Sequence, residues 1–343
     1  MLFPPSVVLE LTYRCNHHCL FCSCPWYAPH SKYPKGDEMC LAEWKTAIDK
    51  LYSMGIQSFS ISGGEALLKD CMPQIVKYIR QKGLENGLDN PIFLISNGLV
   101  MKEEYLHLFK QFNVHLSMSL PGYKTFKLHT GVNNVNGVLR WFKKAKSMGL
   151  HTTVNVTVTQ KNYHELFETI SMGLISGASS VLLNSFLPGG RGLSYMKELV
   201  LTPKQINGML DTAEEVLTLS NRYGSLGTEV AYCAIKNPLK YKHIDIGYKC
   251  AAAKGFFVID PSGNIRTCNH SPHIVGHILK DDIIEDVDYW NKFAQSKYKP
   301  SMCSGCKMLF RCDCGCREVA NILQGDTNAV DTSIIHDHIY SNY

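Results

Sequence analysis

The chain has 343 residues, of which 45% are hydrophobic and 19% charged, and its formal net charge is +5. This balance is typical of a globular protein with room for one large domain and a small one. The mild charge, without a long run of lysine or arginine, disfavours nucleic-acid binding. No stretch approaches the roughly 18 apolar residues of a membrane span.

Fourteen cysteines are many for this length, and they are clustered. Four lie between Cys15 and Cys24, and five between Cys303 and Cys316. Disulfide-rich secreted scaffolds are usually much smaller, and residues 1–5 lack the basic start and apolar core of a signal peptide. We therefore expect a cytoplasmic protein whose thiolates bind metal.

Six strands and six helices alternate through the first two thirds of the chain. Apolar, β-branched runs predict the strands at 7–12, 58–62, 92–96, 114–119, 152–159 and 181–187. Apolar residues at helical spacing predict the helices at 41–54, 73–82, 102–112, 137–148, 163–172 and 203–220. We predict an α/β fold, a partial (β/α)6 TIM-like barrel.

Three parts are expected along the chain: the barrel at 1–220, a linker at 221–249, and a small domain at 250–343. In the last part, a turn signature at 260–264 separates two short apolar runs and predicts a hairpin. In parallel β/α folds the chemistry lies at the carboxyl ends of the strands. The cysteines after residue 12, and the polar residues that end the other strands, all fall there.

Cys15, Cys19 and Cys22 follow the first predicted strand with the spacing C-x3-C-x2-C. Three thiolates can bind three irons of a cubane cluster and leave the fourth iron open, whereas structural zinc usually takes four closed ligands. The motif, with aromatic Phe21 before its last cysteine, resembles the cluster motif of radical S-adenosylmethionine (SAM) enzymes. The alternative is that these are packing cysteines.

The resemblance implies a SAM site at the strand ends. Gly63-Gly64-Glu65 would hold the methionine amine of SAM, and Ser119 would bond to its ribose. Further SAM contacts are expected at four positions: Phe21, Ser96, Asn155 and Arg191. Many relatives have an aspartate where this chain has Pro121, which removes any acid–base role there. The alternative for each residue is a strand-end polar group without a ligand.

A second cysteine pattern begins at Cys250, with Gly263 and then Cys268 after it. Later cysteines continue it with the spacing C-x2-C-x5-C-x3-C at Cys303, Cys306, Cys312 and Cys316. Together they resemble the SPASM extension, which houses auxiliary iron–sulfur clusters. The resemblance implies a first cluster on Cys250, Cys268 and Cys316, and a second on Cys303, Cys306 and Cys312. A zinc ribbon is the alternative.

The family pattern ends with one more cysteine, and none follows Cys316 here. The tail offers Asp331, His336, Asp337 and His338 instead. Our hypotheses give the second cluster a non-cysteine ligand, an open iron or Cys314, and give the first cluster Cys233 as its fourth ligand.

By resemblance, a [4Fe-4S] cluster on three cysteines cleaves SAM reductively, and the 5′-deoxyadenosyl radical abstracts hydrogen from a peptide. Crosslinking, thioether formation or epimerisation in the maturation of a ribosomally made peptide is the leading hypothesis. An external flavodoxin- or ferredoxin-type electron donor is expected. Because the first predicted strand lies near residue 1, we also expect leader recognition by a separate protein or by the barrel surface.

Two alternatives remain open from the sequence. One is sulfatase maturation or dehydrogenation of a small molecule. The other is a non-catalytic iron–sulfur or zinc protein, which Gly63-Gly64-Glu65 in a barrel disfavours. No catalytic acid or base is identified.

Overall fold

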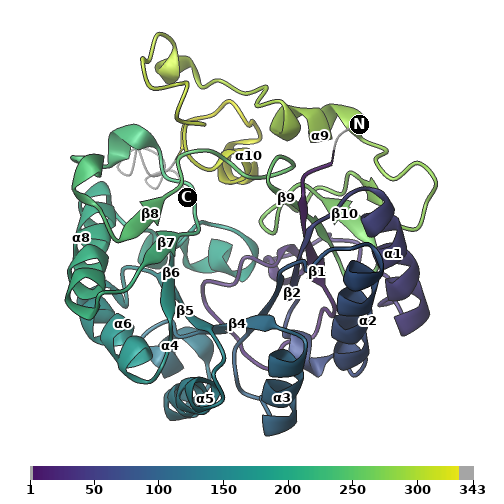
Figure 1. Cartoon of the computed structure of the whole chain (residues 1–343). Helices are drawn as coiled ribbons and strands as arrows, with labels where there is room; N and C mark the ends of the chain where they lie inside the picture. Colours follow the sequence, from purple (N-terminus) through teal and green to yellow (C-terminus); the bar gives the residue numbers. More distant parts are fainter. Residues whose placement is uncertain (1–2, 332–343) are drawn as a thin grey trace.

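One curved sheet of eleven strands organises the chain in the computed structural model, which describes residues 3–331 (Figure 1). The strand order is β11-β10-β9-β1-β2-β3-β4-β5-β6-β7-β8. The strands are β1 (Ser6–Glu10), β2 (Ser58–Ser62), β3 (Ile92–Ser96), β4 (Val114–Ser119), β5 (Thr152–Val158), β6 (Ser180–Ser185), β7 (Gly224–Leu226), β8 (Ile244–Ile246), β9 (Phe256–Ile259), β10 (Asn264–Arg266) and β11 (Gly276–His277).

The described part has ten α-helices, most of which cover the outer side of this arc (Figure 1). They are α1 (Leu41–Ser53), α2 (Met72–Glu85), α3 (Glu103–Gln111), α4 (Phe126–Thr130), α5 (Val135–Ser147), α6 (Leu166–Ile175), α7 (Met196–Leu199), α8 (Pro203–Ser220), α9 (Val287–Ala294) and α10 (Arg317–Gln324). None of those in the described part is long and apolar enough to cross a bilayer.

The predicted β/α alternation is confirmed. Strands β1 to β8 pair in chain order and in parallel, and the six predicted strands and helices lie within a few residues of their expected positions. The segment at 221–249, expected as a linker, carries β7 and β8 and extends the sheet. Strands this short and the one-turn helix α4 have too few residues to show a period. The domain boundaries stay a prediction.

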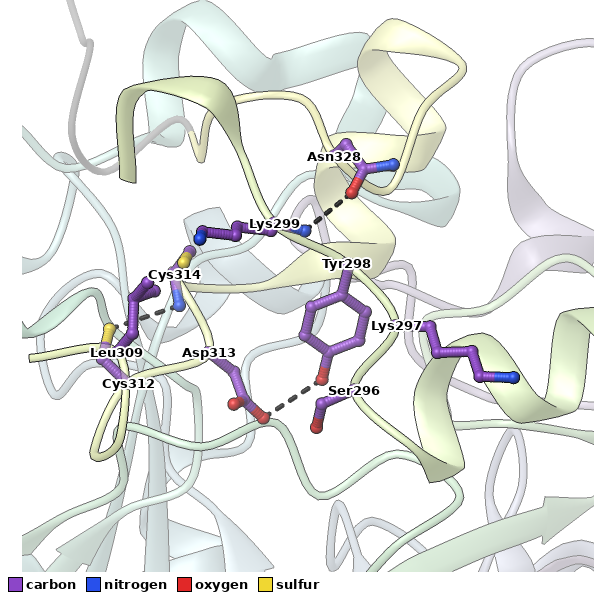
Figure 2. A pocket seen from close by; sticks show the side chains of 9 residues that line it. All are labelled: Ser296, Lys297, Tyr298, Lys299, Leu309, Cys312, Asp313, Cys314 and Asn328. Atoms are coloured by element: carbon purple, nitrogen blue, oxygen red, sulfur yellow. Dashed lines mark hydrogen bonds between the residues drawn. The ribbon is translucent and has the colours of Figure 1, made fainter. Parts of the chain in front are cut away.

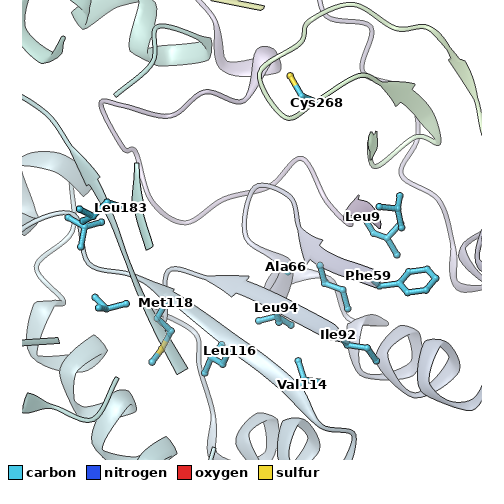
Figure 3. Packing of buried hydrophobic residues seen from close by; sticks show 14 of the residues in the cluster. Leu9, Phe59, Ala66, Ile92, Leu94, Val114, Leu116, Met118, Leu183 and Cys268 are labelled. Carbon is cyan, nitrogen blue, oxygen red and sulfur yellow. The ribbon is translucent and has the colours of Figure 1, made fainter. Parts of the chain in front are cut away.

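The two faces of the sheet differ in polarity. In β5, Val154 and Val156 face the helices and are fully buried, whereas Asn155 and Thr157 point to the inside of the arc and are half-buried. The outward face builds the main core with the helices, and Figure 3 shows part of it in residues such as Phe59. The inward face is left to line a cavity.

The C-terminal cysteine segment is joined directly to the barrel. Strand β9 pairs in parallel with β1, and the segment that carries α10 lies at the open side of the arc (Figure 1). Arg266 of β10 is fully buried and forms an ion pair with Glu10 at the end of β1. Its guanidinium also donates to the carbonyls of Asn269, at 3.1 Å, and Ser271, at 2.9 Å.

Replacing Arg266 tests this link. In Arg266→Met, the Glu10 carboxylate stays buried without its cation, so we expect the free energy of unfolding to fall by about 3–5 kcal/mol. Urea denaturation followed by circular dichroism measures it. Adding Glu10→Gln should restore part of the loss. Lys280→Met, which breaks an exposed pair with Glu285, is the control and should cost at most about 1 kcal/mol. Equal losses in both single variants would contradict the link.

Candidate active site

The three cysteines of the N-terminal motif lie on residues 14–24, here called the cluster loop. Two N–H groups of this loop donate to carbonyls at the end of α4, at 2.9 Å each. The carbonyl of Cys19 accepts from the Arg191 guanidinium, and that of Cys22 from the N–H of Gly192, both at 3.2 Å. Loops that follow β4 and β6 therefore fix the shape of a loop that follows β1.

The thiols of the cluster loop lie close enough to influence one another. Burial raises the pKa of Cys15 to about 11 and that of Cys19 well above its usual range, and charges on neighbouring thiols add to both shifts. The thiol of Cys24 hydrogen-bonds to Cys22 and lowers the pKa of Cys22 to about 7. The Arg191 cation lowers the pKa of Cys15, Cys19 and Cys22. A bound cation would relieve this mutual repulsion.

The three thiols of this loop suit a cluster. A cubane cluster is larger than a single ion and spreads three thiolates over separate irons. Cys22 also faces a cavity, as a cluster with an open iron requires.

The Gly63-Gly64 turn packs its backbone against the start of the cluster loop. The N–H of Gly64 donates to the carbonyl of Thr12, and that of Glu65 to the carbonyl of Arg14, both at 2.8 Å. A Cβ on Gly64 would overlap the Arg14 carbonyl, and Gly63 has a φ of 138°. Only glycine allows this approach, which leaves the backbone of both residues lining the cavity.

The carboxylate of Glu65 lies behind that turn, fully buried, and burial raises its pKa. Its oxygens accept from the hydroxyl of Ser96 at 2.8 Å and from the N–H groups of Asn97, at 2.7 Å, and Leu67, at 3.1 Å. The Asn97 amide in turn lies 3.9 Å from the sulfur of Cys15. Glu65 and Ser96 thus brace the cluster loop, and neither lines the cavity.

The other expected SAM contacts are placed at the same edge of the sheet. Phe21 and Asn155 line the cavity, and the Asn155 side-chain oxygen accepts from Asn184 at 2.8 Å. Ser119 is the register partner of Asn155 at the end of β4. Arg191 holds the cluster loop, as described above, and its role toward SAM stays a prediction.

A cavity of about 380 Å³ joins the N-terminal and C-terminal cysteines. The cluster loop and glycine turn contribute Phe21, Cys22, Cys24, Gly63 and Gly64. The C-terminal part contributes three cysteines of the second pattern: Cys250, Cys268 and Cys316. The polar inward face of β5 and β6 forms the wall between them.

Cys250, Cys268 and Cys316, here called the inner cysteines, were predicted to bind one cluster, and the fold brings them together. Each is at least 91% buried, and charge on one thiol raises the pKa of another. Burial is the main cause of their raised pKa values, which reach about 12 for Cys250. Glu229 also lines the cavity, and its charge acts on Cys250 and Cys316.

Cys303, Cys306 and Cys312, here called the outer cysteines, do not line the cavity. Cys314 lies beside them, and Figure 2 shows its N–H donating to the Cys312 sulfur at 3.2 Å. The structure places Cys233 next to this set, although we expected it at the inner one.

The tail is only partly described. Asp331 is buried, and its carboxylate accepts from the N–H of Cys316 at 2.8 Å. His336, Asp337 and His338 lie outside the described residues.

Three polar groups of the cavity wall were not expected from the sequence. Burial raises the pKa of Glu229 and Glu318 and lowers that of His270, which favours the neutral form of each. They come from two loops and helix α10, which lie far apart in the chain. The position of Glu318, two residues after a cysteine of the second pattern, was the one available hint.

Comparison with protein-family models found a match over the N-terminal part of the chain. Residues 9–172 match the model of the radical SAM superfamily. This match supports the expected enzyme class, for which SAM and a [4Fe-4S] cluster are the expected cofactors.

Similarity extends beyond the radical SAM domain into the cysteine-rich C-terminal part. The PqqA peptide cyclase of Xanthomonas campestris pv. campestris (strain 8004) is 25% identical over 345 residues, which cover 96% of this chain and 86% of that protein. The PqqA peptide cyclase of Rhodopseudomonas palustris is also 25% identical and covers 98% and 89%.

Solved structures support the fold. Streptococcus suis SuiB bound to S-adenosylmethionine has a TM-score of 0.74 at 16% identity, covering 97% of this chain and 77% of SuiB. Native anSMEcpe with bound AdoMet has a TM-score of 0.73 at 17% identity, covering 99% and 96%. The prediction of a partial barrel with a C-terminal extension is confirmed.

The close approach at Gly64 gives a direct test of the site's construction. In Gly64→Ala, the new Cβ pushes the Arg14 carbonyl away, so we expect a loss of about 1–3 kcal/mol in the free energy of unfolding. Gly247→Ala is the matched control, because nothing lies within 4 Å of its Cβ position, and it should stay within about 0.5 kcal/mol. Urea denaturation compares the two, and equal stability of both variants would argue against this packing.

Proposed function

We propose that the chain is a radical SAM enzyme that modifies a ribosomally made peptide. The shared cavity carries this proposal, because one space touches both the cluster loop and the inner cysteines. A peptide side chain in that space would lie between a radical source and a second metal site. The similarity to PqqA peptide cyclases, and the SuiB structure solved with precursor peptide SuiA, support a peptide as the substrate class.

In this proposal, Cys15, Cys19 and Cys22 hold the [4Fe-4S] cluster. When bound, the cluster supplies the electron that cleaves SAM to methionine and a 5′-deoxyadenosyl radical. The backbone of Gly63 and Gly64 binds the methionine amine, while Glu65 keeps that backbone in place. Arg191 offers a cation beside the loop.

The nucleoside end of SAM would lie along β4 and β5. Ser119 and Asn155 offer a hydroxyl and an amide oxygen to the ribose, next to one another in the sheet. Phe21, Phe186 and Leu187 supply apolar surface to the same cavity. They would keep water away from a radical that reacts with any nearby C–H bond.

The inner cysteines would hold an auxiliary cluster that faces the substrate. Such a cluster can accept the electron left on the substrate after hydrogen abstraction or coordinate a substrate thiolate. The outer cysteines would hold a second auxiliary cluster near the surface. An external flavodoxin- or ferredoxin-type protein would supply the electron for SAM cleavage, and a separate protein would present the leader of the peptide.

Oxidation of a single side chain, as in sulfatase maturation, is the second candidate function. The similarity to anSMEcpe, solved with bound AdoMet and Cp18Cys peptide, is in keeping with a peptide substrate for this reaction too. A non-catalytic iron–sulfur protein is less consistent with a glycine-lined cavity beside the cluster loop.

Production of 5′-deoxyadenosine tests the enzyme. The anaerobically reconstituted chain should form it from SAM with dithionite, and Cys22→Ala should form none, because the cluster loses one of its three protein ligands. Cys40→Ser is the control, since Cys40 is exposed at the start of α1, and it should match the parent. Chromatography with mass spectrometry measures the product. An inactive parent with a full iron complement would contradict the proposal.

Mass spectrometry of a treated peptide tests the substrate class. The probe is a synthetic precursor peptide encoded beside this gene. We expect it to lose two hydrogen atoms on crosslinking or thioether formation, or to gain one deuterium from heavy water on epimerisation. Should it stay unchanged while a cysteine-containing sulfatase peptide becomes the aldehyde, the second candidate function replaces the first.

A further inference from the structure

We propose that Cys233 completes the outer set, so that Cys233, Cys303, Cys306 and Cys312 form a four-cysteine site for the second auxiliary cluster. The inference rests on the proposed function, which places a cluster at the outer cysteines. The family pattern has one more cysteine after the position of Cys316, and this chain has none there. Cys233, on a segment that precedes the second cysteine pattern, would take its place.

Backbone geometry holds Cys233 beside Cys312. The N–H of Tyr232, its chain neighbour, donates to the Cys312 sulfur at 3.4 Å. The ring of Tyr232 packs on that of Tyr248, with centroids 4.9 Å apart, and the carbonyl of Tyr248 accepts from the N–H of Asp313 at 2.9 Å. Two independent contacts therefore tie the turn at 232–234 to the segment that carries Cys312.

Backbone N–H groups that donate to sulfurs of the outer set stabilise negative charge on them. That of Cys312 accepts two backbone N–H groups, from Tyr232 and Cys314, and that of Cys306 accepts one from Met308 at 3.4 Å. Backbone N–H donors to sulfur are a regular means of tuning iron–sulfur sites. The carbonyl of Cys303 accepts from the N–H of Cys306 at 3.1 Å, which closes the turn that presents both thiols.

The thiol of Cys233 also lies near the other members of the outer set, because the charges of Cys312, Cys303 and Cys306 act on it. A metal cluster bound by all four cysteines would replace the repulsion between their thiolates by binding, because a coordinated thiol is deprotonated.

Cys314 is the competing ligand, because its place two residues after Cys312 also brings it to the outer set. Its N–H donates to the Cys312 sulfur, and it has a left-handed φ of 63°. Its own thiol hydrogen-bonds to Cys303, and its carbonyl accepts from the buried Arg317 guanidinium. It thus sits on the same short stretch as Cys312, whereas Cys233 arrives from a separate segment.

The test uses the full chain without its N-terminal cluster. In the Cys15→Ala, Cys19→Ala, Cys22→Ala background, all bound iron belongs to the auxiliary sites, and no activity is needed as a readout. Three further variants are compared after anaerobic reconstitution: Cys233→Ser, Cys314→Ser and, as the exposed control, Cys40→Ser. Iron and sulfide analysis and Mössbauer spectroscopy count and identify the clusters, and circular dichroism checks folding.

We expect Cys233→Ser to lose iron from one cluster and, after mild oxidation, to give the electron paramagnetic resonance signal of a three-iron cluster. Cys314→Ser and Cys40→Ser should match the background. Unchanged spectra in Cys233→Ser, a loss in Cys314→Ser instead, or zinc in place of iron would overturn the inference while the radical SAM proposal stands. If the variant that lacks Cys15, Cys19 and Cys22 binds as much iron as the parent, the proposed N-terminal cluster is refuted instead.

Discussion

The ion pair between Glu10 and Arg266 is the constraint on which the two halves of the cavity depend. Glu10 ends β1, four residues before the start of the cluster loop, and Arg266 ends β10, two residues before Cys268. Both are almost fully buried, so neither charge could stay there without the other. The guanidinium also donates to the carbonyls of Cys268, Asn269 and Ser271. Together with the pairing of β9 and β1, this interaction therefore holds Cys268 beside the cluster loop.

The hydrophobic periodicity of the sequence predicted most of the fold, because the two faces of the sheet have different surroundings. The outward face meets helices and is mostly apolar, while the inward face meets a cavity and carries polar groups. In β5 this produces an alternation of valine with Asn155 and Thr157 that is visible in the sequence. Elements of two or three residues, such as β7 and β8, show no such alternation, and pairing within the sheet stabilises them.

The site could be predicted where a motif with defined spacing marks it. The spacing of Cys15, Cys19 and Cys22 predicted the cluster loop, and the longer cysteine pattern predicted the inner set. The position of Cys233 depends on how the turn at 232–234 docks on Cys312, and nothing in its neighbourhood along the chain reveals this. Glu65 shows the same limit in another form. Glu65 fits the motif, but its carboxylate accepts hydrogen bonds from Ser96 and Asn97. Any role of Glu65 at the site is therefore to support the backbone of the turn.

The two cysteine sets differ most in their contact with water. The inner cysteines are buried against the cavity, while Cys233 and Cys306 are exposed. Reduction adds negative charge to a cluster, and water stabilises that charge better than a protein interior does. Solvent exposure is one of the factors that set the potential of iron–sulfur clusters. A cluster at the outer set would thus accept an electron more readily than one at the inner set with the same ligands. An electron released by substrate at the cavity would then move outward, toward the surface where a partner protein could collect it.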